Sequence, residues 1–422
     1  MKKWIFSLLA LCIAIGGGWW FVQNQHSNTT TKHQTETSKK VATSKSSKLD
    51  QAKLAYQQYN YTQADHLLKN EKSQDSSKLK KDISNQSDKL VTWNKPDKFR
   101  HLFFHSLIVN PKKAFKSKSA KGYADYMVTV SEFDKILKQL YQKGYVLVGI
   151  QNLVTNDHGK LKMNSIKLPK GKTPLILSQD DVSYYEYMKG DGFAKDLFVD
   201  GNGQIKNHYV DDGKDQVGNY DLVPIVDQFV RDHPDFSYQG QKGTIALTGY
   251  NGVLGYRTSP SEYKNTAKRN VAIKKATQTA TAMKKDGWTF ASHSWGHINM
   301  TESPLAQIKK DNALWQKEVT PIIGKTDIFI DPFGADIGGV APYNKDNQKY
   351  DYMHQQGFNI FCNVDASHTS WGQIGSNFYR NARINVDGIR FKSDLDKSNP
   401  VLKDFFNVHQ VIDQKDRKSV KS

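Results

Sequence analysis

The sequence contains little cysteine and has fewer acidic than basic residues. Cys12 and Cys362 are the two cysteines in 422 residues, which excludes a small disulfide-stapled scaffold. Asp and Glu total 42 against 60 Lys and Arg, giving a formal net charge of +18. This charge favours affinity for anionic partners, although lysines that only solubilise the surface explain it equally well.

Long hydrophobic runs are also scarce, and the one of note lies at the N-terminus. Residues 4–22 carry no charge and, at about 19 residues, are long enough to span a bilayer. Lys2 and Lys3 place the N-terminus inside the cell. We predict an uncleaved signal-anchor helix over residues 1–23, with the remainder outside the cell membrane.

This topology limits which kind of organism the protein comes from and which partners its exported part can meet. Once Cys12 lies in the membrane, Cys362 has no intrachain partner, and an exported chain without disulfides suits a Gram-positive bacterium. The polyanions available there are anionic wall polymers and lipid headgroups, and nucleic acid is excluded by compartment.

Composition divides the rest of the chain into three parts. Residues 24–48 are a Ser/Thr/Lys-rich linker, too poor in apolar residues to fold. Residues 49–95 place apolar side chains at helical spacing and predict a small helical stalk of two or three helices. Residues 96–415 form the predicted catalytic domain, with an insertion over about 184–241 that is either a lid or substrate-binding loop or a structural excursion.

The catalytic domain alternates apolar, β-branched runs with amphipathic segments, which is typical of an α/β fold built on parallel strands. We predict a distorted (β/α) barrel of about seven strands, with a helix over 131–143. The expected strands are 101–110, 145–150, 173–178, 243–247, 288–291, 326–330, 358–364 and 384–390. In such barrels the chemistry lies just past the C-terminal ends of the strands.

Two strand ends carry residues suited to a metal. The strand 173–178 runs into Asp180 and Asp181, neighbouring carboxylates that are costly without a cation, although a turn or helix-capping pair is the ordinary alternative. Past the strand 288–291 come His293 and His297, which on one helical turn face the same way. Two His and one Asp leave positions open for water and substrate, as hydrolysis requires.

Two further motifs carry less information by themselves. His101 and His105 have the same spacing, but their segment is apolar and strand-like, so we interpret them as mainly structural, with His105 near the barrel mouth. Asp331-Pro332-Phe333-Gly334 predicts a turn that presents a backbone N–H toward the metal, and ordinary turns share its composition.

Together, Ser178-Gln179-Asp180-Asp181, His293-Ser294-Trp295-Gly296-His297 and Asp331-Pro332-Phe333-Gly334 resemble, in order, the first three motifs of the NodB-like polysaccharide deacetylases of carbohydrate esterase family four. Residues 101–150 are also similar to the N-terminal part of the exported poly-N-acetylglucosamine deacetylases. The resemblance spans roughly residues 98–390.

The resemblance implies roles for these residues. Asp181, His293 and His297 would bind a divalent metal, usually zinc, and Asp180 would be the general base that activates water for attack on an acetyl carbonyl. Pro332, Phe333 and Gly334 would contact the substrate, with the N–H near Phe333 stabilising the oxyanion.

The sequence departs from the family pattern at the residue that orients the general base and at the residue that protonates the leaving amine. Gln179 replaces the usual Phe, and Ile330 stands where an Arg orients the base, so Arg380 or Arg383 is expected to supply that charge, and Arg383 to line the substrate site. The final Leu-x-His motif, whose His protonates the leaving amine, is not recognisable.

Two histidines are candidates for the missing general acid. His368 lies just past a predicted strand and is the candidate we favour. His409 has too little chain after it for the usual setting of the motif.

Three functions remain open at this point. The leading one is removal of acetyl groups, N-acetyl rather than O-acetyl, from peptidoglycan or poly-N-acetylglucosamine. A catalytically impaired cell-wall glycan-binding protein is the alternative, motivated by Ile330 and the missing His. A glycosidase is disfavoured, because adjacent aspartates diverge from a strand whereas glycosidases oppose two carboxylates across the bond.

Overall fold

The computed structural model describes residues 46–158, 160–339, 341 and 343–417. The predicted anchor over 1–23, and the linker over 24–48 up to residue 45, lie outside the described residues. Within the described ranges, no helix is both long enough and apolar enough to cross a bilayer. The described residues pack as one compact unit.

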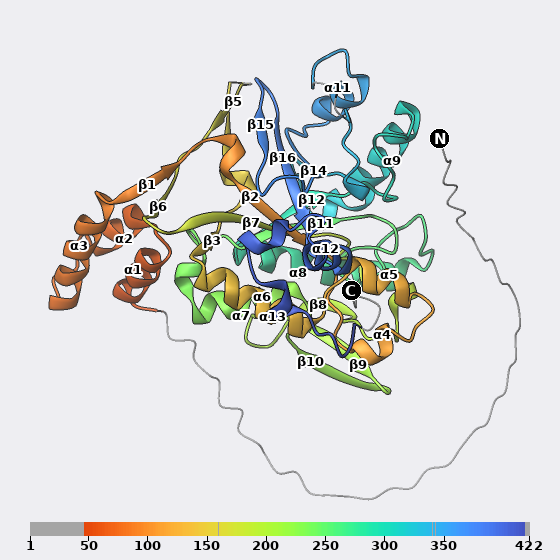
Figure 1. Ribbon diagram of the computed structural model, residues 1–422, viewed down its shortest axis with the longest axis horizontal. Helices are drawn as coiled ribbons and strands as arrows, with labels where there is room; N and C mark the ends of the chain where they lie inside the picture. Colours follow the sequence, from red (N-terminus) through yellow and green to blue (C-terminus); the bar gives the residue numbers. More distant parts are fainter. Residues whose placement is uncertain (1–45, 159, 340, 342, 418–422) are drawn as a thin grey trace, which may run out of the picture. The chain divides into compact units, whose positions relative to one another are not determined.

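The centre of this unit is a closed parallel β-barrel (Figure 1). In the described part of the chain seven strands close it, because β7 pairs with both β2 and β11. The predicted barrel of about seven strands is therefore confirmed. In their order around the barrel the strands are β2 (Arg100–Phe104), β7 (Thr173–Gln179), β11 (Gly243–Leu247), β12 (Trp288–Ser292), β13 (Ile328–Ile330), β14 (Ile360–Val364) and β16 (Tyr379–Asn385).

The distortion of the barrel is concentrated at β7. Its first half pairs with β3 (Tyr145–Leu147), whereas Ser178 and Gln179 pair with β11 on the same edge. β7 thus changes partner along its length. A further strand, β15 (Gly372–Ile374), runs antiparallel to β16.

Alternation along the strands separates an inner from an outer face. On β7, Ile176 packs inside the barrel with Ala246, Ala291 and Cys362, whereas Leu175 and Leu177 pack outward against the helices. Continuing this alternation turns Ser178 and Asp180 toward the barrel axis. The position of Asp180 at the mouth thus follows from the pattern of the strand.

Helices cover the outer face. Of these, α6 (Val130–Gln142) begins with a capping box formed by Thr129 and Glu132 and buries Phe133, Ile136, Leu137 and Leu140. The others are α4 (Pro111–Ala114), α5 (Ala120–Tyr126), α7 (Leu222–Asp232), α8 (Thr266–Lys285), α9 (Leu305–Glu318), α10 (Thr320–Ile323), α11 (Gln348–Gln355), α12 (Gly388–Leu395) and α13 (Val408–Val411).

The predicted insertion contains a small sheet of its own. β8 (Asp196–Val199), β9 (Ile205–Asp211) and β10 (Lys214–Gly218) form three antiparallel strands, and β9 and β10 lie at the lower edge of the molecule in Figure 1. Ile205, Asn207 and Tyr209 alternate inward, which is a strand pattern. Of this segment the sequence predicts either a lid or substrate-binding loop or a structural excursion, and the two-residue period was the signal for strands.

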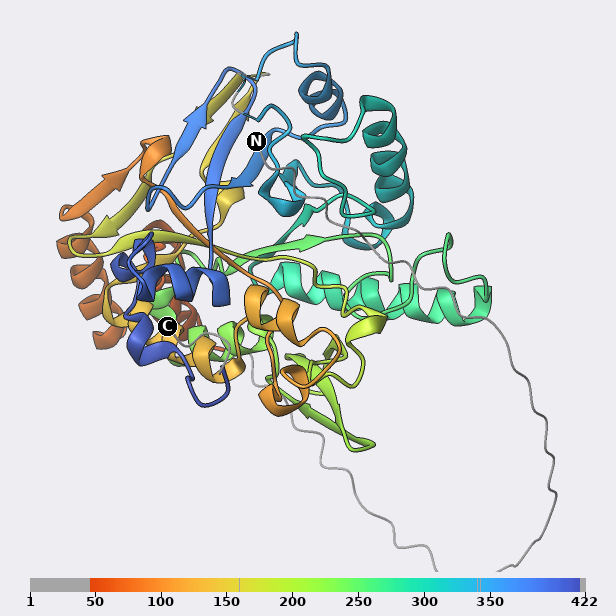
Figure 2. The ribbon, with the colours of Figure 1, turned by 45° about the vertical axis from the view of Figure 1, so that its right-hand side comes forward.

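The predicted helical stalk consists of α1 (Lys48–Gln57), α2 (Tyr61–Leu68) and α3 (Gln74–Ser87), which lie together beside β1 (Leu90–Trp93) and β6 (Ile166–Pro169) in both ribbon views (Figures 1 and 2). The helices share a small core of Ala52, Ala64, Leu68, Leu79 and Ile83. Tyr59 Oη donates to the Asp235 carbonyl at 2.7 Å, so the helices contact the barrel domain directly.

Three predicted strands extend too far. The strand expected over 145–150 is β3, which ends at Leu147, and a 3₁₀ turn begins at Ile150. The strand expected over 384–390 is β16, which ends at Asn385, because the side chain of Asp387 caps α12 by accepting from Arg390 N–H. The strand expected over 101–110 ends at Phe104. A two-stranded hairpin of β4 (Val154–Asp157) and β5 (Lys160–Met163) completes the fold.

Candidate metal centre

The C-terminal ends of the barrel strands converge on one pocket of about 570 Å³. The predicted residues Asp180, Asp181, His293 and His297 all line it. They leave β7 and β12 at one end of the barrel, where parallel strands bring their carboxyl ends together. The other lining residues are Phe103, His105, Tyr126, Met127, Tyr187, Phe333, Gly334, Val364, Arg383, Asn385, Asp387 and Arg390.

Three of these side chains form a candidate metal site. One ligand atom each from Asp181, His293 and His297 lies within 4.8 Å of the others. Asp181 Oδ2 is 3.8 Å from His297 Nε2, while its Oδ1 accepts a hydrogen bond from Tyr185 Oη at 2.6 Å. Tyr185 therefore orients the carboxylate, so that Oδ2 faces the histidines.

The protonation states suit a metal. His293 Nδ1 donates to the Ile330 carbonyl at 2.7 Å, so Nε2 carries the free lone pair. Burial lowers the pKa of His293 to about 4, so the imidazole is neutral at pH 7, as a ligand must be. Burial would raise the pKa of Asp181, but His297 and His293 outweigh it and hold that pKa below its ordinary value.

The donor set fits a hydrolytic divalent metal. Two imidazoles and one carboxylate are a ligand set of catalytic zinc sites, and three protein ligands leave coordination positions open. The buried, neutral His293 and the ionised Asp181 are already in the states that binding requires.

The backbone at this site is strained. Asp181, Ser294, His297 and Phe333 have φ of 62°, 56°, 52° and 60°, the left-handed region that non-glycine residues seldom occupy. Strain of this kind persists where surrounding contacts fix it, and it gathers at functional sites. Asp181, His297 and Phe333 line the pocket and Ser294 adjoins His293, which marks the pocket as functional.

The predicted helical turn carrying His293 and His297 is wrong, because residues 293–297 form a loop. Asp311 fixes this loop by accepting from Trp295 N–H and Gly296 N–H, both at 2.7 Å. The two imidazoles still meet, with ring centroids 4.9 Å apart.

Asp180 lies beside the site and is held by Arg383. Arg383 Nη1 is 2.7 Å from Oδ1 and 2.9 Å from Oδ2 of Asp180, and both side chains are buried. Burial alone would raise the pKa of Asp180, but the charge of Arg383, with smaller effects of His293 and His105, holds it below its ordinary value. Arg380 instead pairs with Asp336 at 2.7 Å and does not line the pocket.

The turn Pro332–Gly334 lies at the mouth beside His297. Phe333 is 69% exposed, and its ring centroid is 4.3 Å from that of His297. A Cβ on Gly334 would lie 2.4 Å from Val364 Cβ, and its φ is 66°, so this position requires glycine. Pro332 is buried and does not line the pocket, whereas Phe333 and Gly334 do.

His105 is a pocket residue that the sequence analysis assigned mainly to structure. Its Nδ1 donates to the Tyr126 carbonyl at 2.9 Å, which leaves Nε2 available to the pocket. Burial raises the pKa of Asp387, and the hydrogen bonds from Asn385 and from Arg390 N–H oppose this, with a smaller effect of His105. His105 follows Phe104, the last residue of β2, which agrees with the predicted place near the barrel mouth. The predicted strand to residue 110 had favoured a structural role over one in the site.

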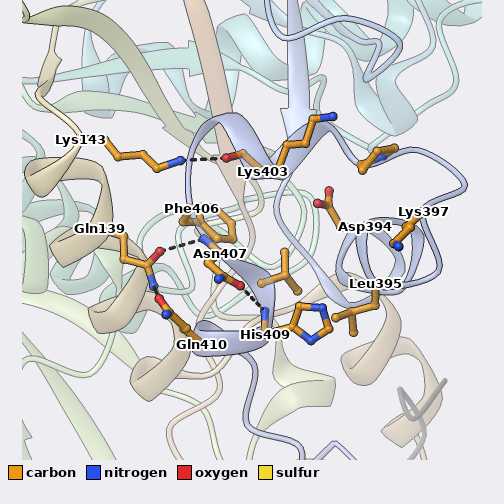
Figure 3. Close-up of a pocket in the computed structure, with 12 residues that line it drawn as sticks. Gln139, Lys143, Asp394, Leu395, Lys397, Lys403, Phe406, Asn407, His409 and Gln410 are labelled. Atoms are coloured by element: carbon orange, nitrogen blue, oxygen red, sulfur yellow. Dashed lines mark hydrogen bonds between the residues drawn. The ribbon is translucent and has the colours of Figure 1, made fainter.

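The structure does not bring His368 or His409 to the metal pocket. His368 is exposed on the loop after β14, where its Nδ1 lies 2.9 Å from Ser367 Oγ. His409 lines a separate hollow of about 690 Å³ between α6, α12 and α13, together with Lys143, Lys403 and Phe406 (Figure 3). The two pockets share no lining residue.

His101, which has the same spacing to His105 as His293 to His297, lies below the mouth inside the barrel. Its ring nitrogens lie 2.8 Å from Asn381 Oδ1 and 2.8 Å from Ser178 Oγ. Burial, with Arg383 nearby, lowers its pKa to about 3, so the ring is neutral. These contacts agree with a structural role.

One of the comparisons with known proteins matches part of the chain to a family model. Residues 262–360 match the family model for polysaccharide deacetylase. This range includes His293, His297 and the turn 331–334, and it lies C-terminal to Asp180 and Asp181. The resemblance predicted from the motifs and the enzyme class, a hydrolytic deacetylase, are confirmed by this match.

No curated protein matches the chain significantly. Among solved structures, the Streptococcus pyogenes deacetylase PplD in complex with acetate matches with 14% sequence identity over 69% of this chain and 93% of that chain, at a TM-score of 0.36.

Proposed function

We propose that this protein is a metal-dependent hydrolase that removes N-acetyl groups from an extracellular amino-sugar polymer, either peptidoglycan or poly-N-acetylglucosamine. The observation that carries the proposal is the cluster of Asp181, His293 and His297 beside the buried pair of Asp180 and Arg383. A polysaccharide deacetylase match over residues 262–360 supports the reaction class.

A divalent metal, Zn²⁺ in our proposal, held by Asp181, His293 and His297 would polarise the acetyl carbonyl and lower the pKa of the attacking water. Asp180 takes the proton of that water, because Arg383 keeps the carboxylate ionised and fixes its direction. We assign the backbone N–H of Phe333 to the developing oxyanion.

We assign protonation of the leaving amine to His105. With Nδ1 bound to the Tyr126 carbonyl, Nε2 is the nitrogen that can deliver a proton into the pocket. The acid is the imidazolium, because Nδ1 keeps its own proton on the Tyr126 carbonyl. As the C–N bond breaks, its electron pair stays on nitrogen and takes the Nε2 proton, which leaves a neutral His105, the free amine and acetate. His105 thereby takes the role that we had predicted for His368.

The rim of the pocket supports a glycan as substrate. Tyr126, Tyr187 and Phe333 line it with side chains that are 53%, 58% and 69% exposed. Exposed rings present flat apolar faces that can stack on the apolar faces of pyranose rings. Tyr187 is itself held by stacking on Tyr185, with ring centroids 5.6 Å apart.

The alternative, a catalytically impaired wall-binding protein, rested on Ile330 and on the missing terminal His. Arg383 contacts Asp180 where the family uses another Arg, and His105 lines the pocket, so both grounds are weaker. We retain the membrane anchor over residues 1–23, the extracellular location and affinity for anionic wall polymers as parts of the proposal, on the hydropathy and charge of the sequence.

The test is acetate release. Zn²⁺-loaded protein is incubated with acetylated chitooligosaccharides, peptidoglycan and poly-N-acetylglucosamine, and acetate and free amine are measured against Asp180→Asn. We expect release from at least one polymer and its loss in the variant. Bound metal with no acetate from any of the three would overturn the proposal in favour of glycan binding alone.

A further inference from the structure

The wall of the metal pocket nearest His105 is the segment from Ala124 to Glu132, which joins α5 to α6. Tyr126 and Met127 line the pocket with their side chains. The Tyr126 carbonyl accepts the hydrogen bond from His105 Nδ1 at 2.9 Å. The position of this one carbonyl therefore fixes Nδ1 as a donor, turns Nε2 toward the pocket and sets the direction of the His105 ring.

A residue from the far end of the chain holds this segment from its other side. Arg417 is 1% exposed, and its Nη1 donates to the Ala124 carbonyl at 2.8 Å while Nη2 donates to the Met127 carbonyl. One guanidinium thus binds the carbonyls on both sides of Tyr126.

The same guanidinium forms a buried ion pair with Glu132. Nε lies 2.6 Å from Oε1 and Nη2 lies 2.9 Å from Oε2 of Glu132, which is fully buried. Glu132 also accepts from Thr129 N–H at 2.8 Å and from Asp413 N–H at 3.1 Å, so its oxygens are well satisfied. Only the planar fork of Arg can reach two carbonyls and a carboxylate together.

The segment is also closely packed against the N-terminus of α12. A Cβ on Gly388 would lie 1.8 Å from the Ala124 carbonyl oxygen and 3.1 Å from Arg417 Nη1. Gly388 follows Asp387, which lines the pocket on the side of α12. The Ala124 carbonyl therefore has little room to move toward α12.

We infer that Arg417 is a positioning residue for the deacetylation: by binding the Ala124 and Met127 carbonyls it fixes the Tyr126 carbonyl and so aims His105 Nε2 at the leaving amine. The inference rests on the proposed function, in which His105 is the general acid. Arg417 itself does not line the pocket.

The test compares two leaving groups, because only one needs a proton. An acetylated chitooligosaccharide releases an amine that must be protonated, whereas an aryl acetate releases a phenolate that need not be. Arg417→Lys keeps the charge but lacks the fork, and Arg417→Met removes both. We expect each to lower kcat on the oligosaccharide by about tenfold or more, with kcat on the ester changed by less than about twofold.

Lys242→Met is the matched control. Lys242 is also a buried cation, paired with Asp227 at 2.7 Å, and it does not line the metal pocket. Its loss should lower stability in the manner of Arg417→Met while leaving the ratio of the two activities unchanged. A third variant, Arg417→Ala, leaves space for a free guanidinium ion. Millimolar guanidinium should restore part of its oligosaccharide activity and should restore no activity to Lys242→Met.

The outcomes separate the two ideas. Arg417 is merely structural, and the inference is overturned, if Arg417→Lys and Arg417→Met lose equal activity on both substrates and guanidinium does not rescue Arg417→Ala. If His105→Ala leaves the ratio of oligosaccharide activity to ester activity unchanged, His105 is not the general acid. The inference then fails, while the proposed deacetylase function stands. A wild-type protein that releases no acetate from any glycan would instead overturn the proposed function on which the inference rests.

Discussion

Arg383 Nη1 lies within 2.9 Å of both carboxylate oxygens of Asp180, inside a barrel that buries both side chains. The two residues come from β16 and from the end of β7, which are joined through β2. The guanidinium provides the charge that the sequence lacks at Ile330. The ion pair between Arg383 and Asp180 should therefore affect how catalysis depends on pH.

Replacing Arg383 should move the acidic limb of the pH profile upward. Without the guanidinium, burial dominates and raises the pKa of Asp180, so the base becomes protonated at a higher pH. We expect Arg383→Met to shift the limb of kcat/KM to higher pH and to lower activity at pH 7 by at least about tenfold.

Arg380→Met is the control for that shift. Arg380 occupies the same strand but pairs with Asp336 and lies outside the pocket. Its loss should leave the acidic limb in place. An unmoved limb in Arg383→Met would show that Asp180 does not depend on Arg383.

Metal removal should abolish turnover and lower stability. A ligand that binds only the folded state at 100 times its Kd adds about 2.7 kcal/mol, so chelation should lower the Tm measurably. His297→Ala and Asp181→Ala should bind less Zn²⁺ in elemental analysis and show no further Tm loss with chelator. Full Zn²⁺ stoichiometry in both variants would place the metal elsewhere.

His105 and His368 should respond in opposite ways to substitution. His105→Ala removes the proton donor that we assign and should lower kcat on an acetylated oligosaccharide by about 10²–10⁴-fold, with bound metal unchanged. His368→Ala alters an exposed loop and should leave kcat within about twofold. The reverse result in steady-state kinetics would restore His368 as the general acid.

The contrast between these two histidines shows how far sequence reasoning reaches. Asp181, His293 and His297 could be predicted because each closely follows a strong apolar strand, and strand ends gather at one barrel mouth. For His105 the place near the barrel mouth was predicted, but a role in the chemistry was not, because residues 105–110 continue the apolar pattern of β2. The strand ends at Phe104, and hydrophobicity alone does not show where a strand leaves a sheet.

Contacts between residues far apart in the sequence were the other feature that the sequence alone did not predict. The contact of Arg383 with Asp180 depends on strand register, which sets Leu102 opposite Ile384 and Leu177 opposite Leu102, and no local pattern fixes that. The charge requirement at Asp180 was nevertheless visible, since Ile330 supplies none. That requirement is why Arg380 and Arg383 were both predicted and why the structure was needed to choose.

The last prediction concerns His101 and stability in acid. Its pKa is about 3 in the folded protein against an ordinary 6.5, so between these values the unfolded chain binds a proton that the folded one excludes. The stabilisation from a neutral His101 is therefore complete above pH 6.5 and is lost as the pH falls toward 3. We expect the urea midpoint of the metal-free protein to decrease as the pH is lowered from 7 to 5.

His101→Gln should flatten this dependence while lowering stability at pH 7 by about 1–3 kcal/mol, because the hydrogen bonds to Ser178 and Asn381 are disturbed. An equally steep dependence in His101→Gln would assign the acid sensitivity to other groups, of which His293 is the nearest candidate because its pKa is lowered to about 4.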